Sequence, residues 1–246
     1  MKSLFFILAF FLIPATFGSD ARNLFPGSVR VTDIGSSVYS MSATGHVTHL
    51  KNGDMFVVDR ETTVKMNYAD SAVFHLSNGV DIFLQDHTDL TFPKKTFMHV
   101  ANSSDYFLRI EFVGTAWFRS SRTPTERDSF FIMTNAAEIE VESSEFYVES
   151  FGESYTLVRC LQGKLRFSSS ETSVSVEVLA GEEARIRGCG EVGCKNAAVT
   201  KYKIPQRFLH TILESRKQAG LSTCPKWVLQ NNCYVTERTA LPSEQN

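Results

Sequence analysis

Residues 72–84 read AVFHLSNGVDIFL, and this stretch decides the fold class. On both sides of the Asn78-Gly79 pair every second residue is apolar, namely Ala72, Phe74, Leu76, Val80, Ile82 and Leu84. A period of two residues is typical of a β-strand that lays one face on a core. Asn-Gly tolerates positive φ at both central positions of a type I′ turn, so the stretch predicts a β-hairpin with that turn.

Short runs of the same kind continue along most of the chain. Ile139 and Val141 alternate with Glu138, Glu140 and Glu142, which predicts that the glutamates keep one face of that strand solvated. Comparable runs occupy 29–31, 37–41, 107–118, 130–133, 146–150, 156–167 and 174–179. Turn residues separate these runs, so the sequence predicts an all-β fold without choosing among a sandwich, a barrel and a solenoid.

A series of motifs in this β region resembles a FecR-type domain. The motifs are GDMF at 53–56, SAVFHLSNG at 71–79, IFL at 82–84, TDL at 88–90, GTAWF at 114–118, FIMTNA at 131–136, LQGKL at 161–165 and LAGEEA at 179–184. They follow the family's order and cover residues 27–187. The resemblance implies one FecR-like β domain over this range, with the form of a twisted β-solenoid or sandwich.

Two positions depart from the family's pattern. Thr134-Asn135 stands where the family has Thr-Pro, and SSEF at 143–146 stands where the family has Gly-Thr-x-Phe. The second change removes a flexible glycine. It therefore remains open whether the chain makes a bulge or a close backbone approach at that point.

Residues 1–18 predict a secretory signal peptide. Lys2 gives a positive start, an apolar run covers 4–13, and small residues lie near 16–18. The apolar run is too short to cross a bilayer, and Pro14 ends it. We therefore expect a periplasmic or secreted protein that is not an integral membrane protein. The signal stands where FecR-type regulators carry their cytoplasmic anti-sigma segment, so direct control of a sigma factor is not expected.

Residues 201–246 predict a C-terminal amphipathic α-helix followed by a disulfide-containing tail. The helix is expected over 205–220, because an apolar stripe with helical spacing is formed by Phe208, Leu209, Ile212 and Leu213. Pro205 suits a first helical turn, and Gly220 suits the position after the last one. Two interpretations remain open: the helix covers an open end of the β core, or it binds a partner.

The five cysteines lie at positions 160, 189, 194, 224 and 233. Cys160 falls within a strand and is expected to be a buried, reduced thiol. Export favours disulfides among the other four, with Cys189–Cys194 and Cys224–Cys233 as first candidates and the crossed pairings still open. These four could also bind zinc, but they lack C-x-x-C spacing, so disulfides are the preferred interpretation.

No pattern points to a catalytic residue, a cofactor or a metal ion. The chain lacks G-x-S-x-G, a P-loop and a dinucleotide-binding motif. His46 and His49 are three residues apart, which places them on opposite faces of a strand and makes a poor metal site. His75 and His87 are expected to be solvated or packed. The acids Asp81, Asp86 and Asp89 are interpreted as residues that keep hairpin edges soluble.

With no pattern that points to catalysis, the function classes left to consider are binding functions. A net charge of −2 without a basic excess does not favour nucleic acid or an anionic membrane as partner. Trp117 and Phe118 could line a glycan groove, but the family pattern implies that they lie in a core strand. We therefore expect an exported, non-catalytic binding module that contacts an envelope or extracellular protein. The alternative is a module that binds cell-envelope glycan.

Overall fold

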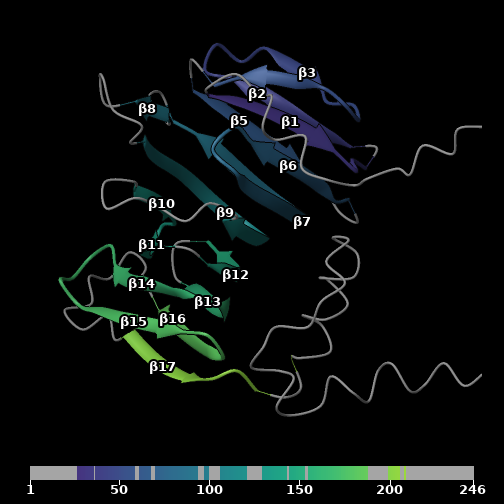
Figure 1. Ribbon diagram of the computed structural model, residues 1–246. Coiled ribbons are helices and arrows are strands. Elements are labelled where there is room, and N and C mark those ends of the chain that lie inside the picture. Colours follow the sequence, from purple (N-terminus) through teal and green to yellow (C-terminus); the bar gives the residue numbers. More distant parts are fainter. Residues whose placement is uncertain are drawn as a thin grey trace, which may run out of the picture.

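The computed structural model describes residues 27–35, 37–58, 61–67, 70–93, 97–99, 106–120, 129–142, 144–152, 155–187, 199–205 and 208. These residues form strands joined by turns and short loops (Figure 1). The strands are β1 (Ser28–Thr32), β2 (Val38–Ser42), β3 (Val47–His49), β4 (Met55–Val57), β5 (Thr62–Met66), β6 (Ala72–Leu76), β7 (Val80–Phe92), β8 (Phe97–His99), β9 (Tyr106–Ser120), β10 (Ser129–Met133), β11 (Ala137–Val141), β12 (Glu145–Phe151), β13 (Tyr155–Gln162), β14 (Lys164–Ser169), β15 (Ser175–Leu179), β16 (Glu182–Arg187) and β17 (Val199–Lys203).

The strands form two layers that share β7 and β9. The first layer has the order β4–β1–β6–β7–β9–β12–β13–β16–β17. The second layer has the order β3–β2–β5–β7–β9–β10–β11–β14–β15, and β8 pairs with the start of β9. Each layer uses a different part of the shared strands: 80–85 and 114–120 lie in the first layer, and 89–92 and 106–113 lie in the second.

Apolar side chains from both layers pack into one core between them. Fully buried members from the first layer include Val29, Phe74, Ile82, Phe118, Phe146 and Val158. Fully buried members from the second layer include Val64, Leu90, Ile110, Ile132, Phe167 and Val178. The rings of Phe56 on β4 and Phe92 on β7 meet edge to face between the layers, with centroids 6.1 Å apart. Burial of this core is the main contribution to the stability of the fold.

Strands β7 and β9 bend sharply where they pass from one layer to the other. The rings of Phe112 and Phe118, six residues apart on β9, have centroids only 5.7 Å apart. In a straight strand six residues span about 20 Å. The bend lies at a bulge in β7, because the pairing with β9 runs from Gln85–Thr115 to Asp89–Val113 and leaves three residues of β7 opposite Gly114 alone.

The bulge is held by a buried threonine. Thr88 Oγ1 donates a hydrogen bond to the carbonyl of Gln85 and accepts one from the backbone N–H of Thr115 at 3.1 Å. His87 takes φ +51° and Gly114 takes φ +121°, so the backbone on both strands is unusual at this point. An added Cβ on Gly114 would lie 2.7 Å from Thr88 Cα. The glycine of the GTAWF motif is therefore required for the two strands to cross closely.

The 72–84 hairpin is confirmed, but its predicted type I′ turn is wrong. Strands β6 and β7 pair in register, and a three-residue loop, 77–79, joins them. The N–H of Gly79 donates to the carbonyl of Leu76 at 3.0 Å, so Ser77 and Asn78 are the central residues of the turn. Neither central residue has positive φ, whereas Gly79 has φ +82°. This is the three-residue hairpin in which a glycine in the left-handed region follows the turn.

The structure confirms the all-β class and adds detail at both ends of the expected β domain. The pairing of β12 with β13 shifts register between Glu145 and Phe146, and the extra residue, Leu161, lies on β13 rather than in the 143–146 stretch. Strand β17 pairs with β16 and extends the sheet beyond residue 187. The predicted signal (1–18), the four cysteines expected in disulfides, and the predicted helix apart from Pro205 and Phe208 lie outside the described residues.

Candidate functional site

The outer face of the first layer, the face turned away from the core, carries a second apolar cluster. Its buried members are Phe83, Trp117, Leu161 and Ile204, and Val73 and Phe208 pack against them. Trp117 is 1% exposed and Leu161 is 0% exposed. The prediction that Trp117 and Phe118 are buried is confirmed, although they face opposite sides of the sheet. Trp117 is thus withdrawn from the solvent that a glycan-stacking residue needs.

A buried arginine lies beside this cluster on the same face. The side chain of Arg159 on β13 is 5% exposed and forms ion pairs with Glu149 at 2.6 Å and with Glu183 at 3.2 Å. Its guanidinium carbon lies 4.2 Å from the centre of the Phe208 ring and 5.6 Å from that of Tyr147. Two carboxylates and two aromatic rings therefore surround one positive charge. The cross-strand pairs Tyr147–Arg159 and Arg159–Glu183 fix this arrangement.

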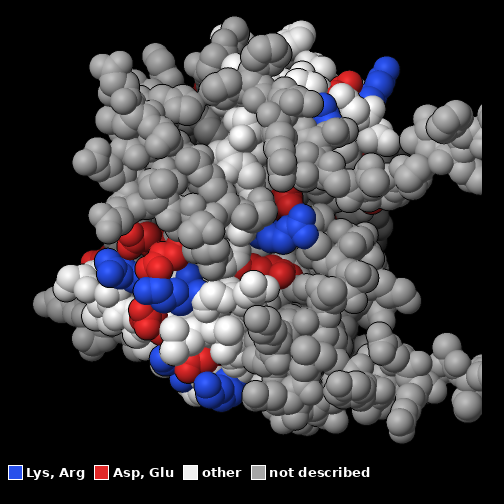
Figure 2. All heavy atoms as spheres, in the orientation of Figure 1, with Lys and Arg blue, Asp and Glu red and all other residues white. Residues whose placement is uncertain are grey.

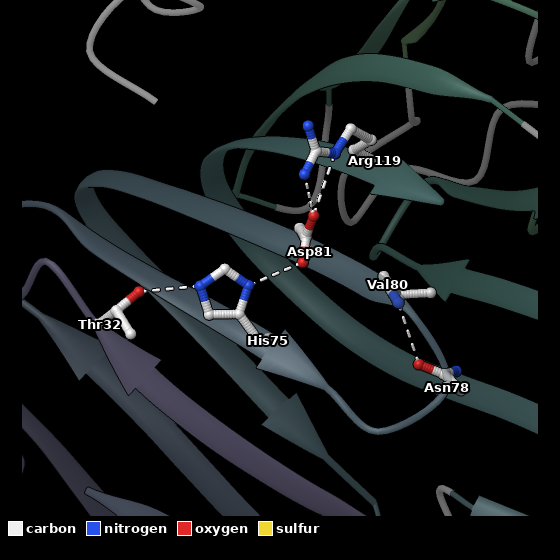
Figure 3. A network of polar contacts seen from close by, with 6 residues as sticks. All are labelled: Thr32, His75, Asn78, Val80, Asp81 and Arg119. Atoms are coloured by element: carbon white, nitrogen blue, oxygen red, sulfur yellow. Dashed lines mark hydrogen bonds and ion pairs between the residues drawn. The ribbon is translucent and has the colours of Figure 1, made fainter. Parts of the chain in front are cut away.

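A polar network crosses the same face nearer to β1 (Figure 3). Asp81 Oδ1 accepts a hydrogen bond from His75 Nδ1 at 2.8 Å, and Asp81 Oδ2 accepts one from Arg119 Nε at 3.0 Å. His75 Nε2 lies 2.9 Å from Thr32 Oγ1. Because the carboxylate can only accept, Nδ1 carries a proton, and Nε2 is the ring atom that faces the Thr32 hydroxyl. The network thus joins β1, β6, β7 and β9.

The order hydroxyl, imidazole and carboxylate also occurs in hydrolases that use a nucleophile and a general base. Here the sheet register alone explains it: His75 pairs directly with Asp81, and Asp81 pairs directly with Arg119. The side chain of Asp81 is 10% exposed and binds Arg119 through its second oxygen. The interpretation of Asp81 as a solvated acid is therefore wrong, because it is buried and tied to two partners. We assign the network a structural role.

The neighbours of Asp81 set the pKa of its carboxyl group. Burial raises the pKa of the Asp81 carboxyl, but the hydrogen bond from His75 and the charge of Arg119 outweigh burial and hold its pKa below the ordinary value. A carboxyl that is a stronger acid in the folded state stabilises that state above its unfolded-state pKa. This contribution is lost as the pH falls through the folded-state pKa.

Asp81→Asn is expected to lower the free energy of unfolding by about 2 kcal/mol at neutral pH, because the amide cannot form the ion pair with Arg119. The difference from the natural protein should shrink as the pH falls below about 4, where this carboxyl is protonated in the unfolded chain, and it should be lost once the pH falls through the lower folded-state pKa of Asp81. Urea unfolding at several pH values between 2 and 7 measures both effects. Asp89→Asn is the control, since its ion pair with Lys65 is more exposed (44% and 33%) than that of Asp81 and contributes less. A constant difference at all pH values would contradict the assignment.

Cys160 is a free thiol whose side chain is completely buried in the main core. Burial raises its pKa to about 12, so the reactive thiolate is scarce at neutral pH. This confirms the expectation of a packed thiol.

Iodoacetamide at pH 8 is expected to leave Cys160 unlabelled in the folded protein and to label it in denaturant. Peptide mass spectrometry of both samples measures the two states. Labelling of Cys160 in the folded protein at the rate seen in denaturant would show that this strand opens readily.

Exposed aliphatic side chains lie on β3 and β4, the edge strands of the two layers. Val47 on β3 is 50% exposed, and Met55 and Val57 on β4 are 47% and 55% exposed. In the described part of the chain β3 pairs only with β2, and β4 pairs only with β1. Each strand therefore has one edge without a described partner strand, and the nearby side chains are apolar.

Charged side chains of both signs alternate elsewhere on the surface. Figure 2 shows them interleaved in the region of β14, β15 and β17. The ion pairs include Arg166–Glu140 at 3.3 Å, Lys164–Glu142 at 3.1 Å and Lys203–Glu182 at 3.2 Å. The prediction for β11 is confirmed, since Ile139 and Val141 are buried. A region of mixed sign creates no extended field of the kind that steers nucleic acid.

Neither metal-binding groups nor spanning helices occur among the described residues. No group of three or more His, Cys, Asp or Glu side chains in these ranges could hold a metal ion. No helix in them has the length and apolar character needed to cross a membrane. His87 is exposed at the bulge in β7.

Comparison with known proteins gives no family match. No protein-family model matches the chain, and no curated protein matches it. Two similar solved structures are crystal structures of a "putative anti-sigma factor" from Parabacteroides distasonis ATCC 8503. Both are 19% identical to this chain; they cover 62% and 61% of it, with TM-scores of 0.48 and 0.47. The match spans 64% of that protein, which is less than two thirds of its length.

Proposed function

We propose that this protein is an exported, non-catalytic binding module with a FecR-like β architecture that contacts a protein in the cell envelope or outside the cell. The single observation that carries the proposal is the pair of edge strands β3 and β4 with their exposed apolar side chains. Export rests on the predicted signal at 1–18. The FecR-like architecture rests on the ordered motifs between residues 27 and 187.

An extended segment of a partner can add to such an edge. In strand addition the backbone hydrogen bonds supply affinity, and pockets or apolar surface for alternate side chains supply specificity. Val57 and Met55 alternate with Phe56, which turns inward to meet Phe92. The outward pair therefore presents apolar surface beside the backbone groups of β4. Exposed apolar surface at a strand edge is otherwise a liability for aggregation, so its presence favours a binding role.

A glycan-binding module is the alternative, and the described aromatic residues favour it less. Glycan recognition uses aromatic rings that stack on sugar faces from solvent. Trp117 and Phe83 are buried in the second cluster. Among the residues that the structure describes, the large aromatic side chains that are exposed are Phe151 and Tyr202. Tyr202 already stacks against Arg185, whose guanidinium carbon lies 4.5 Å from its ring centre.

Affinity capture from an envelope extract tests the proposal, with the natural protein compared against Val57→Lys. A lysine at an exposed edge is tolerated by the fold but opposes pairing with an added strand. The variant should melt like the natural protein and retain less than a tenth of the captured partner. Leu179→Lys is the matched control, because Leu179 is 43% exposed on β15 at the other end of the sheet. This control should capture the partner normally.

Equal capture by Val57→Lys and the natural protein would contradict the edge as the binding surface. A parallel pull-down on envelope glycan separates the two function classes. Retention on glycan with no captured protein would replace the proposed function by the alternative.

A further inference from the structure

The end of the sandwich opposite β3 and β4 has edge strands as well (Figure 1). In the described part of the chain β15 pairs only with β14, and β17 pairs only with β16. Val174 and Leu179, at the two ends of β15, are 45% and 43% exposed. An edge strand with exposed apolar side chains is a template for pairing with a further strand. The two ends of the molecule differ, however, in what contacts the backbone groups of their edges.

The register of β15 identifies the backbone groups on its open edge. At the end of the pairing with β14, the N–H of Ala180 donates to the carbonyl of Gly163 at 3.1 Å. Hydrogen-bonded positions alternate along an antiparallel pair, so the even-numbered residues of β15 bond to β14. The N–H and C=O groups of Glu177 and Leu179 therefore point away from β14, toward the open edge.

Side chains from β16 and β17 bond to two of these edge groups. The N–H of Leu179 donates to Glu182 Oε2 at 3.0 Å. Lys201 Nζ donates to the carbonyl of Glu177 at 3.3 Å. Lys201 Nζ also lies 3.1 Å from Glu182 Oε2, and Lys203 Nζ lies 3.2 Å from Glu182 Oε1. One carboxylate and one ammonium group thus take the places that the carbonyl and the N–H of a neighbouring strand would take.

The ionisation of Glu182 supports this arrangement. Burial raises the pKa of the Glu182 carboxyl, but the hydrogen bond from the Leu179 N–H and the two lysines outweigh burial and hold its pKa below the ordinary value. Glu182 is therefore a carboxylate at neutral pH, and a carboxylate accepts bonds from the backbone and from both lysines at once.

The β4 edge lacks such side-chain partners in the described ranges. The N–H of Val58 donates to the carbonyl of Gly27 at 2.9 Å, so the even-numbered residues of β4 bond to β1. Met55 and Val57 therefore direct their N–H and C=O groups to the open edge. These two are also the exposed apolar residues of the strand.

We propose that Glu182 and Lys201 form a seal that blocks strand addition at β15, and that without this seal β15 accepts strand β4 of a second copy of this chain. Charged side chains that point inward at an edge are a known means of preventing edge-to-edge pairing. The β4 edge fits the unsealed β15 edge, because both have outward backbone groups beside exposed apolar side chains. Such a contact joins different surfaces of two copies, so it produces open chains of molecules. The inference holds whether or not an envelope protein binds β3 and β4.

Hydrogen exchange followed by nuclear magnetic resonance tests the seal itself. In Glu182→Ala the amide of Leu179 should exchange about tenfold faster than in the natural protein, because its acceptor is gone. The amide of Val178 is the internal control. It should keep its protection, since Val178 pairs with Leu165 on β14.

Glu182→Ala combined with Lys201→Thr removes the acceptor and the donor of the seal together. Light scattering should show the mean mass of this double variant rising about threefold over a concentration range in which the natural protein keeps its mass. Adding Val57→Lys should restore the natural mass, because a lysine at the β4 edge opposes pairing. The matched control is Glu142→Ala with Lys164→Thr, which removes an exposed ion pair (54% and 47%) and leaves the seal intact.

Lys201→Thr alone replaces the double variant if the double variant shows no cooperative melt. Unchanged exchange of the Leu179 amide in Glu182→Ala would show that the carboxylate does not protect this edge. A folded, unsealed variant that keeps the natural mass at every concentration would show that β15 does not accept a strand. Association that persists after Val57→Lys would show that the added strand is not β4. Each of these three results would overturn the proposal.

Discussion

Gly114→Ala is expected to lower the free energy of unfolding by about 4 kcal/mol, the sum of backbone strain and steric overlap. Gly114 has φ +121°, a conformation that residues with a Cβ strongly disfavour. The added Cβ would lie 2.7 Å from Thr88 Cα and 2.9 Å from the carbonyl oxygen of His87. Both neighbours are backbone atoms of the bulge, so they cannot move aside as a flexible side chain would. Urea unfolding followed by circular dichroism measures the loss.

Gly45→Ala is the matched control for this prediction. Gly45 also has positive φ, +79°, but no atom lies within 4 Å of its added Cβ. Its substitution therefore adds strain without overlap and should cost about 1 kcal/mol. The difference between the two variants isolates the close crossing of β7 and β9. Equal losses would mean that the bend does not depend on the contact between Gly114 and Thr88.

Arg159→Ala is expected to lower the free energy of unfolding by about 4 kcal/mol, because it leaves two carboxylates without their positive partner. The side chain of Glu183 is 5% exposed and that of Glu149 is 23% exposed. The substitution also removes the guanidinium whose carbon lies 4.2 Å from the centre of the Phe208 ring, so that ring loses its cation–π partner. Thermal and urea unfolding measure the loss.

Two further variants separate charge from packing at Arg159. Arg159→Met combined with Glu183→Gln replaces the buried ion pair by groups of similar volume, and it should recover a large part of the lost stability. Arg166→Ala is the control, since the ion pair of Arg166 with Glu140 is exposed (66% and 38%) and its loss should be almost neutral. A double variant as unstable as Arg159→Ala would show that stacking on Phe208 matters more than the ion pairs.

The sequence by itself determined the fold class and the inward-facing residues. Alternation with a period of two is a local property, so it identifies strands such as 72–76 and 137–141 and the face that each one buries. It also located the hairpin, because glycine at position 79 has to lie in a turn. The turn type was not determined, since a two-residue loop and a three-residue loop place the same glycine at positive φ.

Only the tertiary structure decided how the layers meet. The bend depends on Thr88 and Gly114, which are 26 positions apart, and neither residue looks unusual in its own segment. The GTAWF motif is visible in the sequence, but the sequence does not show why its first residue has to be glycine. That reason is a steric contact between two strands, and periodicity along one strand cannot show it.

The polar contacts of the outer face were likewise decided by tertiary structure. Asp81 looks like a solvated acid in the sequence because its strand alternates regularly. It is buried because the register of β6, β7 and β9 places His75 and Arg119 beside it. Arg159 gave no signal at all, because its partners Glu149, Glu183 and Phe208 come from separate segments. Local alternation determines which side chains face away from the core. Pairing between distant strands decides which of these side chains contact one another.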